Sequence, residues 1–295
     1  MALEQSLSYT WRMGRFANSK ALAGASFGVL KSEKKLAAIP IVSAVTCGVI
    51  AVAVGGGVIL TADFIANPAP GQDDFAMTPA SWAVGIVGLF LIGLVSQMFA
   101  ATLIAAANER LDGGSFTMGQ AFSKATSRTP SILGWSAINS TVGLLLQAVR
   151  DKAGFLGDIA AGLIGAAWNV VTWLVLPIII VEGVGPIVAI KKSANLLKTT
   201  WGENLFAQAG IGLIGFLLML PGILIFGALS LVVPVVGIPL LFIWVVVIGC
   251  LMSALGAIYR TALYRFAVGL PNGDAFTQDE LSGAFKTKVK SGRTR

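Results

Sequence analysis

The residues of this chain that could do chemistry are mostly carboxylates, because the sequence contains no histidine. The lack of histidine removes the commonest general base and metal ligand, and every Ser-His-Asp or Cys-His arrangement. Glu109, Glu182 and Glu203 lie at the ends of long apolar runs. A carboxylate pair acting on lipid is one interpretation, and anchoring by nearby lysines and arginines is the simpler one. We therefore predict no catalytic residue, no cofactor and no metal site.

A glycine motif in the second half of the chain matches the dinucleotide fingerprint. Gly210, Gly212 and Gly215 have the spacing G-x-G-x-x-G. That fingerprint requires a preceding strand and an acidic residue about 20 residues later. Here the motif lies inside an apolar run, and Val235 and Val236 occupy the region of the acid. A small-residue face that lets another helix approach closely is the better interpretation, and it also fits Gly55–Gly57, Gly85 with Gly88, and Gly162 with Gly165.

A few polar residues lie within the apolar runs. Asn139-Ser140-Thr141 matches a glycosylation sequon, but such an acceptor must lie on an exposed loop of a secreted protein. Hydrogen bonding between helices is the ordinary role of such residues, at about 0.6 kcal/mol each, and a polar track for a substrate is the alternative. Cys47 and Cys250 are best read as small buried residues, with a disulfide between them as the less favoured option. The other polar residues of this set are Gln97, Asn169, Thr172, Gln208 and Ser253.

These residues must be positioned by membrane-spanning helices. Of the 295 residues, 56% are hydrophobic and 12% charged, whereas a soluble domain carries about 25% charged residues. A spanning helix needs about 20 apolar residues, and lipid permits no open strand edge. We predict one six-span domain over residues 1–265, with a short helix and basic tail over 266–295. The predicted spans are Leu36–Phe64, Ser81–Ala107, Ile132–Val149, Ile159–Val181, Leu205–Leu229 and Val235–Tyr264.

The basic residues alternate between the two sides of these spans. With six crossings, 19 of the 21 lysines and arginines fall on one side and 2 on the other. The positive-inside rule then places both termini in the cytoplasm. The net charge of +7 fits the anionic inner leaflet better than nucleic acid, because it lies beside apolar runs. We expect a multi-pass protein of the prokaryotic cytoplasmic (inner) membrane.

Each pair of spans is preceded by a basic, half-apolar stretch. These stretches are Ser19–Lys35, Phe116–Arg128 and Pro186–Trp201. In the third, Ile187, Ile190, Ala194 and Leu197 recur at helical spacing after a proline suited to a first helical position. The predicted fold is therefore all-α, with three hairpins that are each headed by an amphipathic helix in the cytoplasmic interface; ordinary loops are the alternative. Thr277 and Glu280 form a capping-box pattern for the short C-terminal helix.

Three blocks resemble an uncharacterised family of multi-pass prokaryotic membrane proteins, domain-of-unknown-function family 6159. The blocks are Ala25–Lys31 with Leu36–Pro40, Asn108–Gly114 with Gly119, Ala121 and Trp135, and Glu182–Gly183 with Pro186–Ser193 and Trp201–Asn204. The similarity extends to about Phe285. The third block also resembles the membrane domain attached to some glycerophosphodiester phosphodiesterases, but no soluble phosphodiesterase domain is present. The family implies no reaction or ligand.

The leading hypothesis is a non-enzymatic membrane component that organises lipid or associates with another membrane protein. A carrier for a lipidic or uncharged substrate is the alternative, suggested by the segments Leu220–Gly222 and Val232–Pro239, and an interfacial lipid-modifying enzyme ranks third. The expected partners are membrane lipids with anionic head groups, and a partner membrane protein or a second copy, but no nucleic acid. The candidate contact residues are Lys31, Lys34, Lys35, Lys124, Arg128, Lys191, Lys192, Lys198, Trp135 and Trp201.

Overall fold

The computed structural model of this chain describes residues 15–64, 75–201, 208–273 and 276. The described part is helical except for one small strand pair. Its elements in chain order are α2 (Arg15–Ser32), α3 (Lys35–Thr61), β1 (Asp63–Phe64), β2 (Phe75–Ala76), α4 (Pro79–Leu111), α5 (Met118–Thr126), α6 (Thr129–Val171), α7 (Val175–Glu182), α8 (Pro186–Trp201), α9 (Gln208–Val232) and α10 (Pro234–Ala267). The sequence did not predict the strands, which pair antiparallel between α3 and α4.

Among the residues that the structure describes, six helical segments are long and apolar enough to cross a membrane, in agreement with the predicted number of spans. In five of them only 6–11% of the apolar window is buried, against 44% in the fourth, so most of this apolar surface faces lipid. The protein is therefore an all-α, multi-pass membrane protein. The segments are Lys35–Thr61, Pro79–Leu111, Thr129–Lys152, Gly157–Glu182, Gly215–Val232 and Pro234–Ala267.

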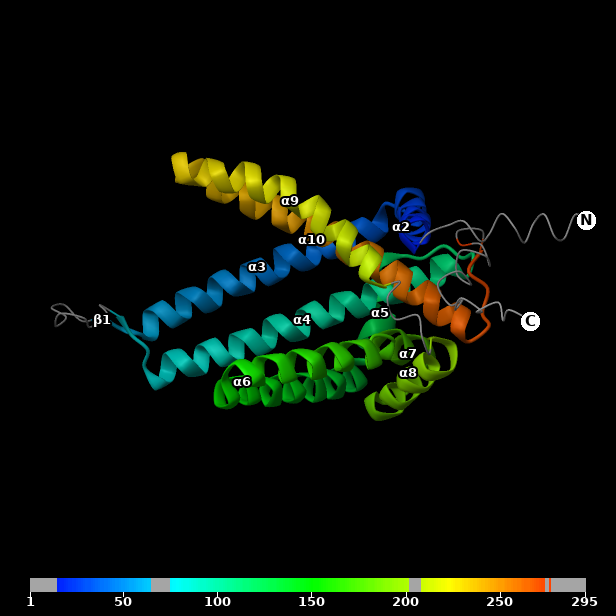
Figure 1. Cartoon of the computed structure of the whole chain (residues 1–295), viewed down its shortest axis with the longest axis horizontal. Coiled ribbons are helices and arrows are strands. Elements are labelled where there is room, and N and C mark those ends of the chain that lie inside the picture. The colour runs from blue at the N-terminus through cyan, green and yellow to red at the C-terminus, as the bar shows by residue number, and fades with distance from the viewer. Residues whose placement is uncertain (1–14, 65–74, 202–207, 274–275, 277–295) are drawn as a thin grey trace, which may run out of the picture.

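The spanning helices form three arms that extend from a common base (Figure 1). The arms are α3 with α4, the two halves of α6, and α9 with α10. The base contains α2, α5, α7 and α8 together with the adjoining ends of α4 and α10. The arm of α9 and α10 diverges from the arm of α3 and α4, and we call the space between these two arms the fork. Helices occupy all three stretches for which the sequence predicts them, as α2, α5 and α8.

The third and fourth spans are joined without the loop that the sequence suggested between Arg150 and Asp158. Helix α6 runs from Thr129 to Val171 and is interrupted only at Gly154, where φ is 55° and ψ is −145°. Residues with a side chain rarely adopt this conformation. The two halves then meet through the stacked rings of Trp135 and Trp168, whose centroids are 6.2 Å apart. One glycine thus reverses the chain, and the flanking residues stay helical.

The prolines of the last arm do not interrupt its helices. Pro221 lies inside α9 and Pro239 inside α10, so the helix is continuous through Leu220–Gly222, whereas the segment Val232–Pro239 contains the turn between the two helices. The break between the helices is at Val233. The backbone amides of Val236 and Gly237 donate to the carbonyl of Val233 there, and this tight turn needs no charged or polar loop.

Buried side chains concentrate in the base. They include Leu36 and Ile39 of α3, residues 101–107 of α4, residues 174–180 around α7, and the last three turns of α10. In α8 the buried residues are Ala189, Ser193 and Leu197, whereas Ile187 is 61% exposed. Of the residues predicted to face lipid, Leu197 is therefore packed inside the protein, whereas Ile187 is exposed, as a lipid-facing side chain would be. Ser193 takes part in the buried face because its hydroxyl donates to the carbonyl of Val171 at 2.5 Å, one of the carbonyls left open where α6 ends.

Several of the predicted glycine contacts pack helices within the arms. A Cβ atom on Gly88 of α4 would lie 2.3 Å from a methyl of Val54 in α3, and one on Gly215 of α9 would lie 2.7 Å from Met252 in α10. Gly57 and Gly165 also lie against a facing helix, whereas Gly55, Gly56 and Gly162 have open space around them. Small residues thus hold the members of an arm together where no hydrophobic force between helices exists in lipid.

The contact of Gly88 with Val54 predicts a specific sensitivity. Gly88→Ala should lower the unfolding temperature in detergent, because overpacking typically costs about 1–3 kcal/mol. Gly93→Ala, on the same helix but with nothing within 4 Å of the added atom, is the matched control and should be neutral. Adding Val54→Ala to Gly88→Ala should restore part of the stability. Equal unfolding temperatures for the two single variants would contradict the packing.

Candidate functional site

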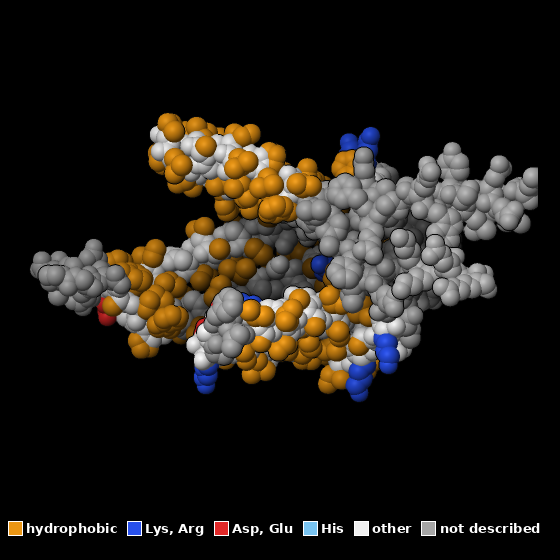
Figure 2. Space-filling view, viewed as in Figure 1, with side chains coloured by type: hydrophobic (Ala, Val, Ile, Leu, Met, Phe, Trp, Pro, Cys, Tyr) orange, Lys and Arg blue, Asp and Glu red, His pale blue; other side chains and the backbone are white. Residues whose placement is uncertain are grey.

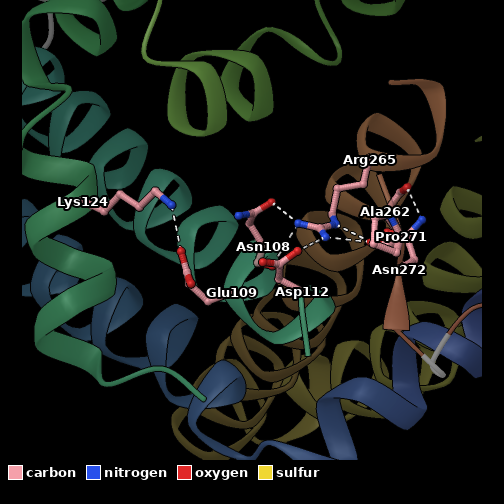
Figure 3. Close-up of polar contacts among 8 residues, drawn as sticks. All are labelled: Asn108, Glu109, Asp112, Lys124, Ala262, Arg265, Pro271 and Asn272. Carbon is pink, nitrogen blue, oxygen red and sulfur yellow. Dashed lines mark hydrogen bonds and ion pairs between the residues drawn. The ribbon is translucent and has the colours of Figure 1, made fainter. Parts of the chain in front are cut away.

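The base contains a buried guanidinium that ties α10 to α4. Arg265 of α10 is only 2% exposed. Its Nη1 donates to Asn108 Oδ1 at 2.8 Å, and its Nη2 donates to a carboxylate oxygen of Asp112. Nε and Nη2 both donate to the carbonyl of Pro271, at 2.9 and 2.7 Å (Figure 3). The planar guanidinium thus donates hydrogen bonds both to the end of α4 and to the turn after α10.

A second polar cluster joins three helices at the carboxylate of Glu182. Tyr264 of α10 donates its hydroxyl proton to Glu182 Oε1, and Lys192 Nζ of α8 lies 2.5 Å from the same oxygen. A third contact joins α5 to α4, where Lys124 Nζ lies 2.8 Å from Glu109 Oε1 (Figure 3). The side chain of Glu109 is 43% exposed and that of Lys124 34%, so this pair contributes at most about 1 kcal/mol.

These contacts decide what the carboxylates can do chemically. Glu109 and Glu182 both face a lysine, and Glu182 also accepts a hydrogen bond from the hydroxyl of Tyr264, which suits anchoring of helix ends. Glu203 lies outside the described residues. Within the described segments, no group of three or more Cys, Asp or Glu residues could hold a metal ion.

Arg128 lies at the junction of α6, α7 and α8. Gly183 ends α7 in the left-handed conformation, with φ of 71°, and a Cβ atom there would lie 2.4 Å from the guanidinium of Arg128. The guanidinium therefore rests on the glycine at the C-terminus of α7, where a positive charge is favoured by the helix dipole. Arg128 Nε is buried and has no hydrogen-bond partner.

The predicted contact residues divide into two groups in the structure. Five of them, Lys31, Lys34, Lys35, Lys191 and Lys198, are exposed at the base. The others that can be described face protein: Lys124 and Lys192 pair with glutamates, Arg128 rests on Gly183, and Trp135 is 6% exposed. The side chain of Trp201 lies outside the described part. The exposed lysines are thus the members of the set that could meet head groups.

A cavity of about 280 Å³ lies at the closed end of the fork, between α3, α4 and α10. Ser43, Ser96 and Ser253 line it, one from each helix, together with the thiols of Cys47 and Cys250 and apolar side chains. Both cysteines are free. Cys250 Sγ lies 3.5 Å from the carbonyl of Pro40. Two of the serines, Ser96 and Ser253, are exposed, so the cavity opens sideways and is not sealed inside a closed bundle.

The chain matches the model of a family of unknown function, DUF6159, over residues 82–274. This match covers well over half of the 295 residues. The chain belongs to the DUF6159 family. The matched region of this DUF6159 protein runs from α4 to the turn after α10, so it contains Arg265 with its partners and Glu182 with its partners, whereas α2 and α3 lie outside it. No curated protein and no solved structure matches the chain.

The role of Arg265 was missed in the sequence, where it counted only as one more basic residue after the last span. The available signal was its position. Asn108 and Asp112 follow the second span on the same side of the membrane, so the three residues had to lie at one level. Which ends meet across 157 residues depends on how the arms pack, and local sequence does not encode that packing.

Arg265→Lys should destabilise the protein although it keeps the positive charge. A lysine has one nitrogen and cannot reach Asn108, Asp112 and Pro271 together, and a lost hydrogen bond to a charged group costs about 1.5–3 kcal/mol. The measurement is the unfolding temperature in detergent. Arg150→Lys, at an exposed arginine far from the base, is the matched control. An unchanged midpoint for Arg265→Lys would show that the network does not hold α4 to α10.

Proposed function

We propose that this protein is a non-enzymatic component of the prokaryotic inner membrane that organises lipid around its fork. The observation that carries the proposal is the sideways-open cavity between α3, α4 and α10. Figure 2 shows hydrophobic side chains covering both arms that border the fork. We expect lipid chains to occupy this space, because proteins rarely expose such large apolar surfaces to water.

The distribution of charge supports an orientation for this arrangement. The exposed lysines Lys31, Lys34, Lys35, Lys191 and Lys198 belong to the base, whereas Arg150 and Lys152 lie near the far end of the α6 arm. By the positive-inside rule, the base faces the cytoplasm. Helices α2, α5 and α8 then lie at the cytoplasmic interface, each heading one arm, and the exposed lysines reach the anionic head groups.

Association with another membrane protein remains part of the proposal, because the arms also expose small residues. Gly143 and Gly162 have nothing within 4 Å of an added Cβ atom, and such positions allow a second helix to approach closely. A carrier for a lipidic or uncharged substrate is the second candidate, and it is favoured by the same cavity with its serine hydroxyls. Movement of a fluorescent lipid between the leaflets of vesicles containing the protein separates a carrier from an organiser.

The orientation predicts opposite labelling at the two ends of the first arm. In a chain with both native cysteines replaced by serine, Asp63→Cys should react with a membrane-impermeant maleimide in intact spheroplasts. Lys31→Cys, at the base, should react only after permeabilisation, because its side chain faces the cytoplasm. The reverse pattern would invert the orientation, and labelling of both residues in intact spheroplasts would contradict the spanning arm itself.

Lipid organisation predicts that the protein carries anionic lipid selectively. Replacing Lys31, Lys34 and Lys35 by glutamine should lower the enrichment of phosphatidylglycerol in polymer-extracted particles several-fold, since each basic residue near the surface contributes about 1 kcal/mol. The measurement is lipid mass spectrometry against the bulk membrane. Arg150→Gln with Lys152→Gln, which removes exposed charge from the other end, is the matched control. A wild-type particle without lipid enrichment or a protein partner would refute the proposed function.

A further inference from the structure

One guanidinium inside the last spanning helix has no anionic partner among the described residues. Arg260 lies seven residues before α10 ends at Ala267, and it is exposed. Its guanidinium carbon lies 5.5 Å from the ring centroid of Trp173. The other arginine near this end of α10, Arg265, is paired with Asp112. A charge at this depth is costly unless an anionic group neutralises it.

The face of α10 that carries Arg260 leads directly to the cavity. Gly249, Ser253, Gly256 and Arg260 follow one another at steps of four, three and four residues, so they share one side of the helix. Gly249 and Ser253 line the cavity, and a Cβ atom on Gly249 or Gly256 would meet nothing within 4 Å. At 1.5 Å per residue, Arg260 lies about 10 Å along the helix from Ser253 and about 16 Å from Gly249.

The cavity offers hydroxyl groups without partners. Ser43, Ser96 and Ser253 make no hydrogen bond to another described residue. The contact of Cys250 with Pro40 places those two residues at one depth. Ser43 and Ser253 are each three residues from that level, about 4.5 Å away in opposite directions. From the base outward, the order is therefore a cation beside an indole, then the hydroxyl of Ser253, then the hollow that Gly249 and Ser43 line.

We propose that this face of α10 is a binding site for one phospholipid of the leaflet at the base. The phosphate lies on Arg260, whose planar guanidinium can donate two hydrogen bonds to phosphate oxygens. Trp173 borders the head group as interfacial tryptophans do. The ester oxygens accept from Ser253, and one acyl chain follows Gly249 into the cavity. The site rests on the proposed function and specifies where a lipid is held and by which group it is recognised.

The order of groups selects this ligand over simpler ones. An uncharged amphiphile would leave Arg260 without a counter-ion among the described residues, and a free phosphate would leave the cavity unused. A cavity of about 280 Å³ is below the usual range for pockets that enclose a whole ligand, roughly 300–1,000 Å³. It therefore suits a single chain whose head group stays outside at Arg260.

Native mass spectrometry of the full chain tests the site. The protein in mild detergent is titrated with phosphatidylglycerol, with diacylglycerol of the same chains, or with inorganic phosphate. We expect one retained phosphatidylglycerol per chain and little retained diacylglycerol, with no competition from phosphate. Arg260→Gln should reduce retention about tenfold, the factor expected for a lost charged hydrogen bond, and Gly249→Leu should reduce it by obstructing the cavity. Arg150→Gln and Gly143→Leu, at exposed positions away from the fork, are the matched controls.

A second measurement uses the native thiol of Cys250 in the cavity and leaves Arg260, Ser253 and Gly249 unchanged. In a chain carrying Cys47→Ser, phosphatidylglycerol should slow alkylation of Cys250, and diacylglycerol or phosphate should not. Equal retention by wild type, Arg260→Gln and Gly249→Leu, or equal retention of both lipids, would overturn the site and leave lipid organisation intact. Failure of the wild type to retain any lipid would refute the proposed function as well.

Discussion

The structure depends on one buried charge at the base. Arg265 is almost fully enclosed, and a buried guanidinium is tolerated only when its donors are satisfied. Asn108 and Asp112 at the end of α4 and the carbonyl of Pro271 satisfy them. Because these groups come from both ends of the matched region, α4 and α10 must meet there. The network thus sets the point from which the arms extend.

The arms follow different physics from the base. Lipid gives no hydrophobic drive between helices, so close contact requires small residues or interhelical hydrogen bonds. Each arm has such contacts between its own two helices, as at Gly88 with Val54 and at Gly222 with Trp244. Within the fork, α3 and α10 meet near Pro40 and Cys250 and diverge beyond that level. A polar base with pairwise arms therefore gives an open fork and not a closed bundle.

This division also separates the basic residues by role. Arg265, Lys192 and Lys124 face carboxylates of the protein itself, and Arg128 rests on a helix C-terminus. The lysines of α2, of the start of α3 and of α8 that face outward are exposed and can meet anionic head groups. Arg260 lies on the side of α10 that also carries Ser253 and Gly249 of the cavity. Counting positive charge would treat all of these residues alike.

The sequence alone determined that the chain lies in a bilayer, that it has six spans, and on which side of them positive charge gathers, because hydropathy and span length are local properties imposed by the bilayer. It also identified some of the packing glycines. It placed a loop around Gly154, where a single glycine with positive φ reverses the chain. It also assigned Leu197 to a lipid-facing side of α8, whereas the structure buries this residue in the protein. Tertiary structure alone decided that Arg265 meets Asn108, that Tyr264 meets Glu182, and that Ser43, Ser96 and Ser253 share one cavity. These contacts join residues far apart in the chain, and packing of the arms on the base, which no local pattern encodes, brings them together.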